Sequence, residues 1–168
     1  MTLQGIDFSW PSSVARHSAA IAPGGQYPMV VFSPGSWIQG NAYSDFGETM
    51  ASYGFIVVAI SHTGDLPQNW TPDPETQSAR DRPRDVQFTI DQMLLKNQTV
   101  GDPFYGRIDE QAIGAAGHSF GGYSIMAAQA GYGRYELAAD PRISRLCLFH
   151  QERIPTLLGR VAQASRCC

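Results

Sequence analysis

The chain has 168 residues, of which 43% are hydrophobic and 16% charged, and its formal net charge is −3. This size predicts one globular domain, and the charge balance excludes the basic surface that nucleic-acid binding requires. No apolar run approaches the roughly 18 residues of a transmembrane helix, and the first residues lack a secretion-signal pattern, so a cytoplasmic location is only the default expectation.

The first part of the chain predicts an edge strand followed by two buried strands. Residues Ile6–Trp10 alternate between apolar and polar side chains, as a half-buried strand does. Continuous apolar runs at Met29–Phe32 and Phe55–Ile60 are typical of buried parallel strands. The stretch Asn41–Tyr53 between them is compatible with a helix that places its large apolar residues on one face.

The second part predicts two more strands and two helices. A proline-rich loop, Thr63–Arg82, precedes a predicted helix, Pro83–Asn97. The small residues Ala112–Ala116 predict a third strand, which a glycine-rich turn connects to a helix ending near Ala130. The run Ile143–Phe149 predicts a fourth strand. Alternating strands and helices indicate an α/β fold, with a mostly parallel sheet flanked by helices.

The motif G-x-S-x-G stands between the third strand and the following helix, as Gly117-His118-Ser119-Phe120-Gly121. In the nucleophile elbow, such a serine occupies the apex of a strained strand-to-helix turn, and glycines two residues away prevent collisions. A strand of small residues before the motif and a helix after it supply the required context. The motif therefore predicts Ser119 as a nucleophile, the alternative being a plain glycine-rich turn.

A second loop, SPGSW, follows the first buried strand. An oxyanion hole in this type of site needs two backbone N–H groups, one after the nucleophile and one from such a loop. Phe120 and Ser36 occupy those two positions. Trp37 and His62 also follow strands and are candidates for lining a substrate pocket, whereas packing is the alternative role for each.

Five segments together resemble one family: YPMVVFSPGSW, YGFIVVAISHTGD, RPRDVQFTIDQML, GRIDEQAIGAAGHSFGGYSIMAA and DPRI. In order and spacing they are similar to bacterial predicted dienelactone hydrolases, which resemble platelet-activating factor acetylhydrolases and polyester hydrolases. The similarity runs from about Tyr27 to Ile143. It implies the α/β-hydrolase fold, with Ser119 as nucleophile, the Ser36 and Phe120 amides as oxyanion donors, and an ester of short or medium acyl length as substrate.

One position departs from that family, and one segment is not expected to take part in its chemistry. Pro34 stands where family members often have histidine. Within the resemblance, Arg82, Pro83 and Asp85 look like the start of a helix and not like catalytic groups.

A catalytic serine also needs a histidine base and a carboxylate that orients the base. The chain order Ser119, Asp140, His150 is permitted, but Asp140 precedes a parallel strand and so lies at the sheet edge away from the strand carboxyl ends. The triad acid and histidine are therefore not identified. No cofactor is expected, and no metal, because the histidines lack ligand-like spacing.

The chain is interpreted as a single, partial α/β-hydrolase domain over residues 1–168, with an atypical tail at 144–168. The tail is basic and ends in two cysteines, and the family resemblance stops before it. We hypothesise that truncation or a frameshift interrupts the chain shortly after Ile143, which leaves the fold incomplete at its C-terminal side. An unpaired strand at Ile143–Phe149 would then favour self-association through an exposed sheet edge.

Two classes of function remain open. The first is a serine hydrolase that acts on carboxylic esters through an acyl-enzyme at Ser119. The second is a catalytically inactive fragment or a ligand-binding pseudo-hydrolase, because no triad acid or base is identified. Either way, the expected partner is a small-molecule or lipid ester.

Overall fold

The structure, a computed structural model, describes residue 12 and residues 15–66 and 74–149. The predicted edge strand Ile6–Trp10 lies outside the described residues. His150 and the rest of the atypical tail after Phe149 also lie outside them.

The described residues form a four-stranded sheet in which all neighbouring strands are parallel. In chain order the strands are β1 (Tyr27–Ser33), β2 (Ile56–Ala59), β3 (Ile108–His118) and β4 (Ile143–Phe149). Across the sheet their order is β2-β1-β3-β4. The predicted parallel α/β architecture is confirmed, and β4 has the predicted bounds. β3 extends beyond the predicted Ala112–Ala116 in both directions.

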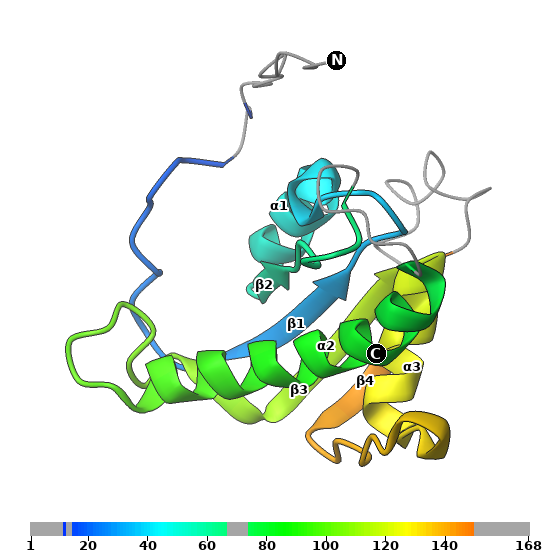
Figure 1. The fold of residues 1–168 in the computed structure, drawn as a ribbon. Coiled ribbons are helices and arrows are strands. Elements are labelled where there is room, and N and C mark those ends of the chain that lie inside the picture. Colours follow the sequence, from blue (N-terminus) through cyan, green and yellow to red (C-terminus); the bar gives the residue numbers. More distant parts are fainter. Residues whose placement is uncertain (1–11, 13–14, 67–73, 150–168) are drawn as a thin grey trace.

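Helices pack against both faces of this sheet (Figure 1). The short 3-10 helix η1 (Gly40–Tyr43) leads into α1 (Ser44–Ser52), which contacts β2, while α2 (Pro74–Gln98) and α3 (Phe120–Ala130) contact each other. A further 3-10 turn, η3 (Gly133–Tyr135), follows α3.

Side chains of β1 alternate between two hydrophobic clusters. Met29 and Val31 pack with residues of α2 and α3, whereas Val30 and Phe32 pack with residues of η1 and α1. Successive residues of a strand point to opposite faces, so a strand covered on both faces needs apolar residues at every position. This explains the continuous apolar run at Met29–Phe32.

The prediction that a helix begins at Pro83 is wrong, because α2 begins at Pro74 and Pro83 lies inside it. A proline inside a helix cannot donate to the carbonyl four residues earlier, here that of Ala79. The Tyr123 hydroxyl of α3 donates to this carbonyl instead, with an O···O distance of 3.0 Å. The packing of α3 against α2 thus replaces the hydrogen bond that Pro83 removes. The local sequence does not show this replacement.

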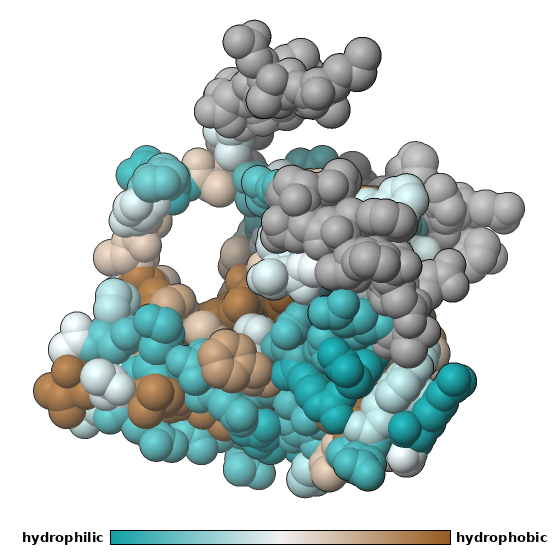
Figure 2. Space-filling model, in the orientation of Figure 1, coloured by the Kyte–Doolittle hydropathy of each residue, from teal (hydrophilic) through white to brown (hydrophobic). Residues whose placement is uncertain are grey.

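On the face shown in Figure 2, hydrophilic residues predominate along α2. Hydrophobic surface appears at one end of the molecule, over the turn that follows this helix, where Val100 and Tyr105 are exposed. Within the described part of the chain, no helix combines the length and apolar character that spanning a membrane requires.

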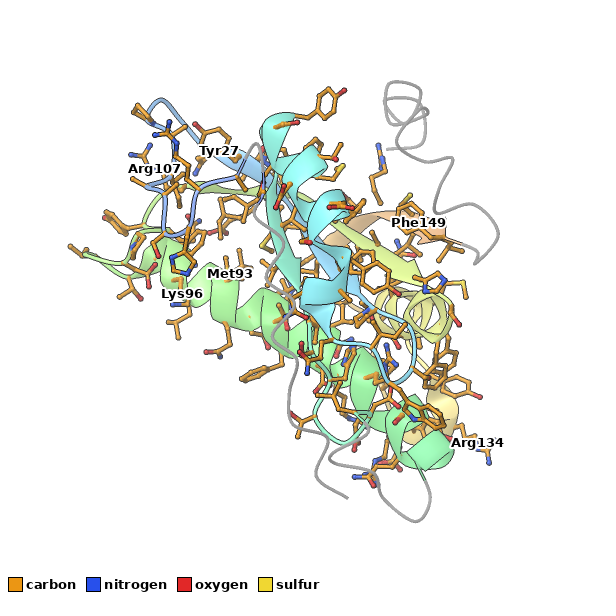
Figure 3. The ribbon with its side chains drawn as sticks, turned by 90° about the horizontal axis from the view of Figure 1, so that it is seen from above. Tyr27, Met93, Lys96, Arg107, Arg134 and Phe149 are labelled. Carbon is orange, nitrogen blue, oxygen red and sulfur yellow. The ribbon has the colours of Figure 1, made fainter. Side chains whose placement is uncertain are left out.

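The parallel arrangement brings the carboxyl ends of all four strands to one edge of the sheet. Figure 3 shows Tyr27, at the start of β1, beside Arg107, and Phe149, at the end of β4, on the opposite side of the molecule. Active groups of open α/β sheets gather at the carboxyl ends of the strands. This edge is therefore where a functional site is expected.

The compensation at Pro83 predicts an energetic coupling between α2 and α3. Tyr123→Phe should lower the free energy of unfolding by about 0.5–1.5 kcal/mol, because the Ala79 carbonyl loses its donor. In a Pro83→Ala background, the new backbone N–H supplies a donor and the same substitution should cost less. A double-mutant cycle by chemical denaturation measures this coupling. Equal costs in both backgrounds would contradict it.

Candidate functional site

Ser119 lies at the turn between β3 and α3, with a backbone φ of 53° and ψ of −121°. A positive φ is unfavourable for a residue with a side chain and is retained only where the surrounding structure enforces it. The residue is exposed at the carboxyl edge of the sheet, and its N–H donates to the Phe149 carbonyl at 3.3 Å. This is the strained strand-to-helix geometry that the G-x-S-x-G motif predicts.

Two glycines allow the chain to pass through this turn. A Cβ atom at Gly117 would overlap the carbonyl oxygen of Gly121, on the other side of the turn. A Cβ at Gly121 would overlap the Ser33 carbonyl oxygen and would lie 2.6 Å from that of Pro34. The backbone of α3 therefore touches the carboxyl end of β1, and only glycine permits this approach.

The loop after β1 lies directly beside Ser119. A Cβ built on Gly35 would be 3.6 Å from the Cβ of Ser119. The next residue, Ser36, is exposed, and among the described residues its N–H has no hydrogen-bond acceptor. Phe120 is the first residue of α3, where backbone N–H groups lack intrahelical partners. Two backbone N–H groups that have no acceptor among the described residues thus belong to segments that adjoin Ser119.

Trp37 contributes its backbone to this loop and its side chain to the surface. Its φ is 64°, and its N–H donates to the Asp65 carbonyl at 3.1 Å, which ties the loop after β1 to the loop after β2. The indole side chain is 59% exposed. This exposure leaves the ring of Trp37 accessible beside Ser36.

His62 does not lie on the surface of the site, since it is 2% exposed. Its Nδ1 is 2.7 Å from Asp85 Oδ2, and its Nε2 is 2.9 Å from Ser33 Oγ. Burial is the largest influence on this ring and lowers the pKa of His62 below its usual value, while Asp85 opposes the effect. This environment argues for a structural contact and against direct contact with a substrate.

The chain Ser33, His62, Asp85 has the chemical order of a catalytic triad, but Ser33 is 0% exposed. No ester carbonyl reaches a hydroxyl that is closed off in this way. The Arg82 guanidinium also donates to Ser33 Oγ, at 3.3 Å. A serine that accepts a charged donor is a poor nucleophile, so this trio is a buried polar network behind the site.

Arg82 is the largest fully buried polar residue of this network, with an exposure of 1%. Its guanidinium donates to the Asp65 carboxylate and to the Pro34 carbonyl. Burial lowers the pKa of Arg82 and Asp65 opposes that effect, so the side chain keeps its charge. The sequence does not reveal these roles, because Arg82 and Asp85 look like the start of a helix and their partners lie far along the chain.

His118, the variable residue of the motif, is turned toward η1. Its Nδ1 lies 2.7 Å from the Tyr43 hydroxyl, which also lies 3.5 Å from the Gly35 N–H. Burial raises the pKa of Tyr43, so this hydroxyl stays protonated near neutral pH and shares a hydrogen bond with the imidazole. Tyr43 therefore supports the loop beside Ser119 from the other face of the sheet.

In the described chain, no histidine is hydrogen-bonded to the Ser119 hydroxyl. Asp140 is buried at the opposite edge, where Arg142 binds its two oxygens at 2.8 and 2.6 Å. His150 lies outside the described residues. Nor do three or more His, Cys, Asp or Glu side chains of the described segments form a group suited to a metal ion.

The described sheet and helices form an α/β fold, and a family model and a known protein match part of the chain. A family model for platelet-activating factor acetylhydrolase, isoform II, matches residues 9–80, which stop before Ser119. The platelet-activating factor acetylhydrolase of Bos taurus is 35% identical over 60 residues. That match covers 36% of this chain and 14% of the bovine protein.

These two matches support a platelet-activating factor acetylhydrolase-like family of α/β hydrolases for this chain, with partial coverage. The chain matches only a small part of the length of its bovine relative. The matched region includes β1, α1 and β2, and therefore the loop that carries Ser36 and Trp37.

The contact between α3 and β1 predicts opposite effects for two helical glycines. Gly121→Ala should destabilise the fold by about 2 kcal/mol or more, because its Cβ meets backbone carbonyls that cannot move cheaply. Gly47→Ala in α1 is the matched control, since its Cβ meets only a Val57 methyl at 4.0 Å. It should be neutral or stabilise by about 0.5–1 kcal/mol. Urea denaturation measures both, and equal effects would disprove the steric constraint.

The buried imidazole predicts a loss of stability on mild acidification. His62 has a folded pKa below its unfolded value of 6.5, so its contribution is fully present above pH 6.5 and decreases as pH falls below that value. The charged groups that act on this ring are Asp85, Arg82 and Asp65.

His62→Gln should therefore flatten the decline in unfolding free energy between about pH 6.5 and 5.5. His17→Gln, at an exposed position, is the control and should keep the wild-type slope. Thermal and denaturant unfolding at stepped pH provide the measurement. An unchanged slope in the His62 variant would show that another group is responsible.

Proposed function

We propose that this chain is a serine hydrolase of carboxylic esters, in which Ser119 forms an acyl-enzyme. The observation that carries the proposal is the strained conformation of Ser119, φ 53° and ψ −121°, between a strand and a helix N-terminus. The loop containing Ser36 adjoins this serine, which supports a role for its backbone N–H as an oxyanion donor.

In the proposed reaction, Ser119 Oγ attacks the ester carbonyl while its proton is removed by a base. The carbonyl oxygen becomes an oxyanion and accepts hydrogen bonds from the N–H groups of Ser36 and Phe120. Collapse of the tetrahedral intermediate expels the alcohol and leaves the acyl group on Ser119. Water then hydrolyses the acyl-enzyme and regenerates the serine. The base and its orienting acid are not assigned to any described residue.

The proposed substrates are esters with a short or medium acyl group, held near the exposed ring of Trp37. The name of the bovine relative refers to an acetylhydrolase of platelet-activating factor, so acetyl esters of phospholipids are the first candidates within this class. Small acyl groups need little room beyond the oxyanion donors. A water-soluble acetate ester is therefore a suitable first probe.

The alternative function is a ligand-binding pseudo-hydrolase, which keeps the edge around Ser119 without turnover. It is favoured by one observation, that no histidine of the described chain bonds to the Ser119 hydroxyl. In that case an ester would bind at the same edge and remain intact.

β4 is an outermost strand of the described sheet. We therefore include in the proposal a self-association of two chains through this strand.

An active-site probe separates the two functions. A fluorophosphonate should label the wild-type chain at Ser119, and Ser119→Ala should abolish both labelling and turnover of p-nitrophenyl acetate. Ser52→Ala, which removes an exposed serine at the end of α1, is the matched control and should retain both. Labelling that persists in the Ser119 variant would disprove the nucleophile. Absence of labelling in the wild type, with saturable ester binding, would favour the pseudo-hydrolase.

A further inference from the structure

One buried guanidinium contacts three of the segments that meet beside Ser119. Arg82 of α2 donates to the Pro34 carbonyl in the loop after β1 and to the Asp65 carboxylate in the loop after β2. Its Cζ also lies 5.0 Å from the ring centroid of Phe120, the residue after the nucleophile. The two proposed oxyanion donors, Ser36 and Phe120, thus belong to segments that share one buried cation.

A second set of bonds closes a ring around the loop. Arg82 binds the Asp65 side chain, and the Asp65 backbone carbonyl accepts from the Trp37 N–H at 3.1 Å. Pro34 and Trp37, which flank the Gly35-Ser36 dipeptide, are therefore both fixed by the same pair of charged residues. The Ser36 N–H lies between two anchored points, which limits its freedom to rotate away from Ser119.

The hydrogen bonds of His62 lie at the end of β1, where this loop begins. Arg82 can only donate, so Ser33 Oγ accepts from it at 3.3 Å, and the same hydroxyl oxygen lies 2.9 Å from His62 Nε2. The imidazole then donates from Nδ1 to Asp85. Because the Asp85 carboxylate can only accept, the neutral imidazole keeps its hydrogen on Nδ1, and its Nε2 accepts from the Ser33 hydroxyl.

We propose that Arg82 is a positioning residue that holds the two oxyanion donors in register with Ser119. The catalytic part of this inference rests on the proposed hydrolase function. The ordering of the loop by Arg82 does not depend on whether the chain turns over an ester. A buried ion pair adds little net stability once its desolvation is counted. The Arg82–Asp65 pair is therefore better explained by the geometry that it imposes than by its contribution to stability. The planar fork of arginine reaches a carbonyl and a carboxylate at once, which a lysine ammonium cannot do in the same way.

The first test measures loop order by hydrogen exchange of the full chain. Arg82→Lys keeps the charge and loses the fork, so amide exchange in peptides covering residues 34–38 should rise on the order of tenfold or more. Arg142→Lys is the matched control, because the Arg142 guanidinium also joins two partners, the carboxylates of Asp140 and Asp91, but at the opposite edge of the sheet. It should leave exchange in this loop at the wild-type rate.

The second test measures the chemistry at Ser119. The rate constant for fluorophosphonate labelling should fall by about 10- to 100-fold in Arg82→Lys, with little change in the concentration that half-saturates the reaction. Arg142→Lys should label at the wild-type rate even where its melting temperature falls. A merely structural role for Arg82 would lower the folded fraction without changing the rate constant of the folded protein.

The outcomes separate the two proposals. Unchanged loop exchange in a folded Arg82→Lys chain overturns the positioning role, whatever its activity. Raised exchange with no labelling of the wild type supports loop positioning and rejects the hydrolase proposal. If Arg82→Lys does not fold, Asp65→Asn replaces it, because this substitution keeps the side-chain shape and the backbone bond to Trp37. Wild-type exchange in that variant would likewise overturn the inference.

Discussion

The structure around Ser119 depends on a direct contact between two backbones. The first turn of α3 lies against the carbonyl groups of Ser33 and Pro34, so closely that residue 121 has no room for a Cβ. This contact brings the turn after β3 beside the loop after β1. Without it, the turn that carries Ser119 and the loop that carries Ser36 would not adjoin.

Behind this contact lies a compact set of buried charges. Arg82 and Asp65 are 1% and 6% exposed, and Asp85 reaches the buried ring of His62. Such groups are costly to remove from water, and they remain stable only when each donor meets an acceptor. Their bonds reach the loops after β1 and β2. The polar network therefore connects the exposed segment that contains Ser36 to the sheet by hydrogen bonds.

The helix α2 illustrates how the surroundings change a local preference. Pro83 would normally begin a helix, but here the helix passes through it, since Tyr123 supplies the missing donor to Ala79. The extension brings Arg82 to a buried position on the helix and not to a loop before it. The same residue that looked like part of a helix start in the sequence consequently lies at the centre of the network beside the site.

The sequence by itself determined the order of elements, the parallel α/β architecture and the position of the sharp turn at Ser119. Apolar runs at Met29–Phe32 and Ile143–Phe149 and the glycines of the motif are local signals, because they reflect burial and backbone sterics at their own positions. Only the tertiary structure decided the partners of Arg82, Asp65 and His62. Each of these bonds joins residues 17 to 49 positions apart, and such pairings arise from how the elements pack together, which a single sequence does not state.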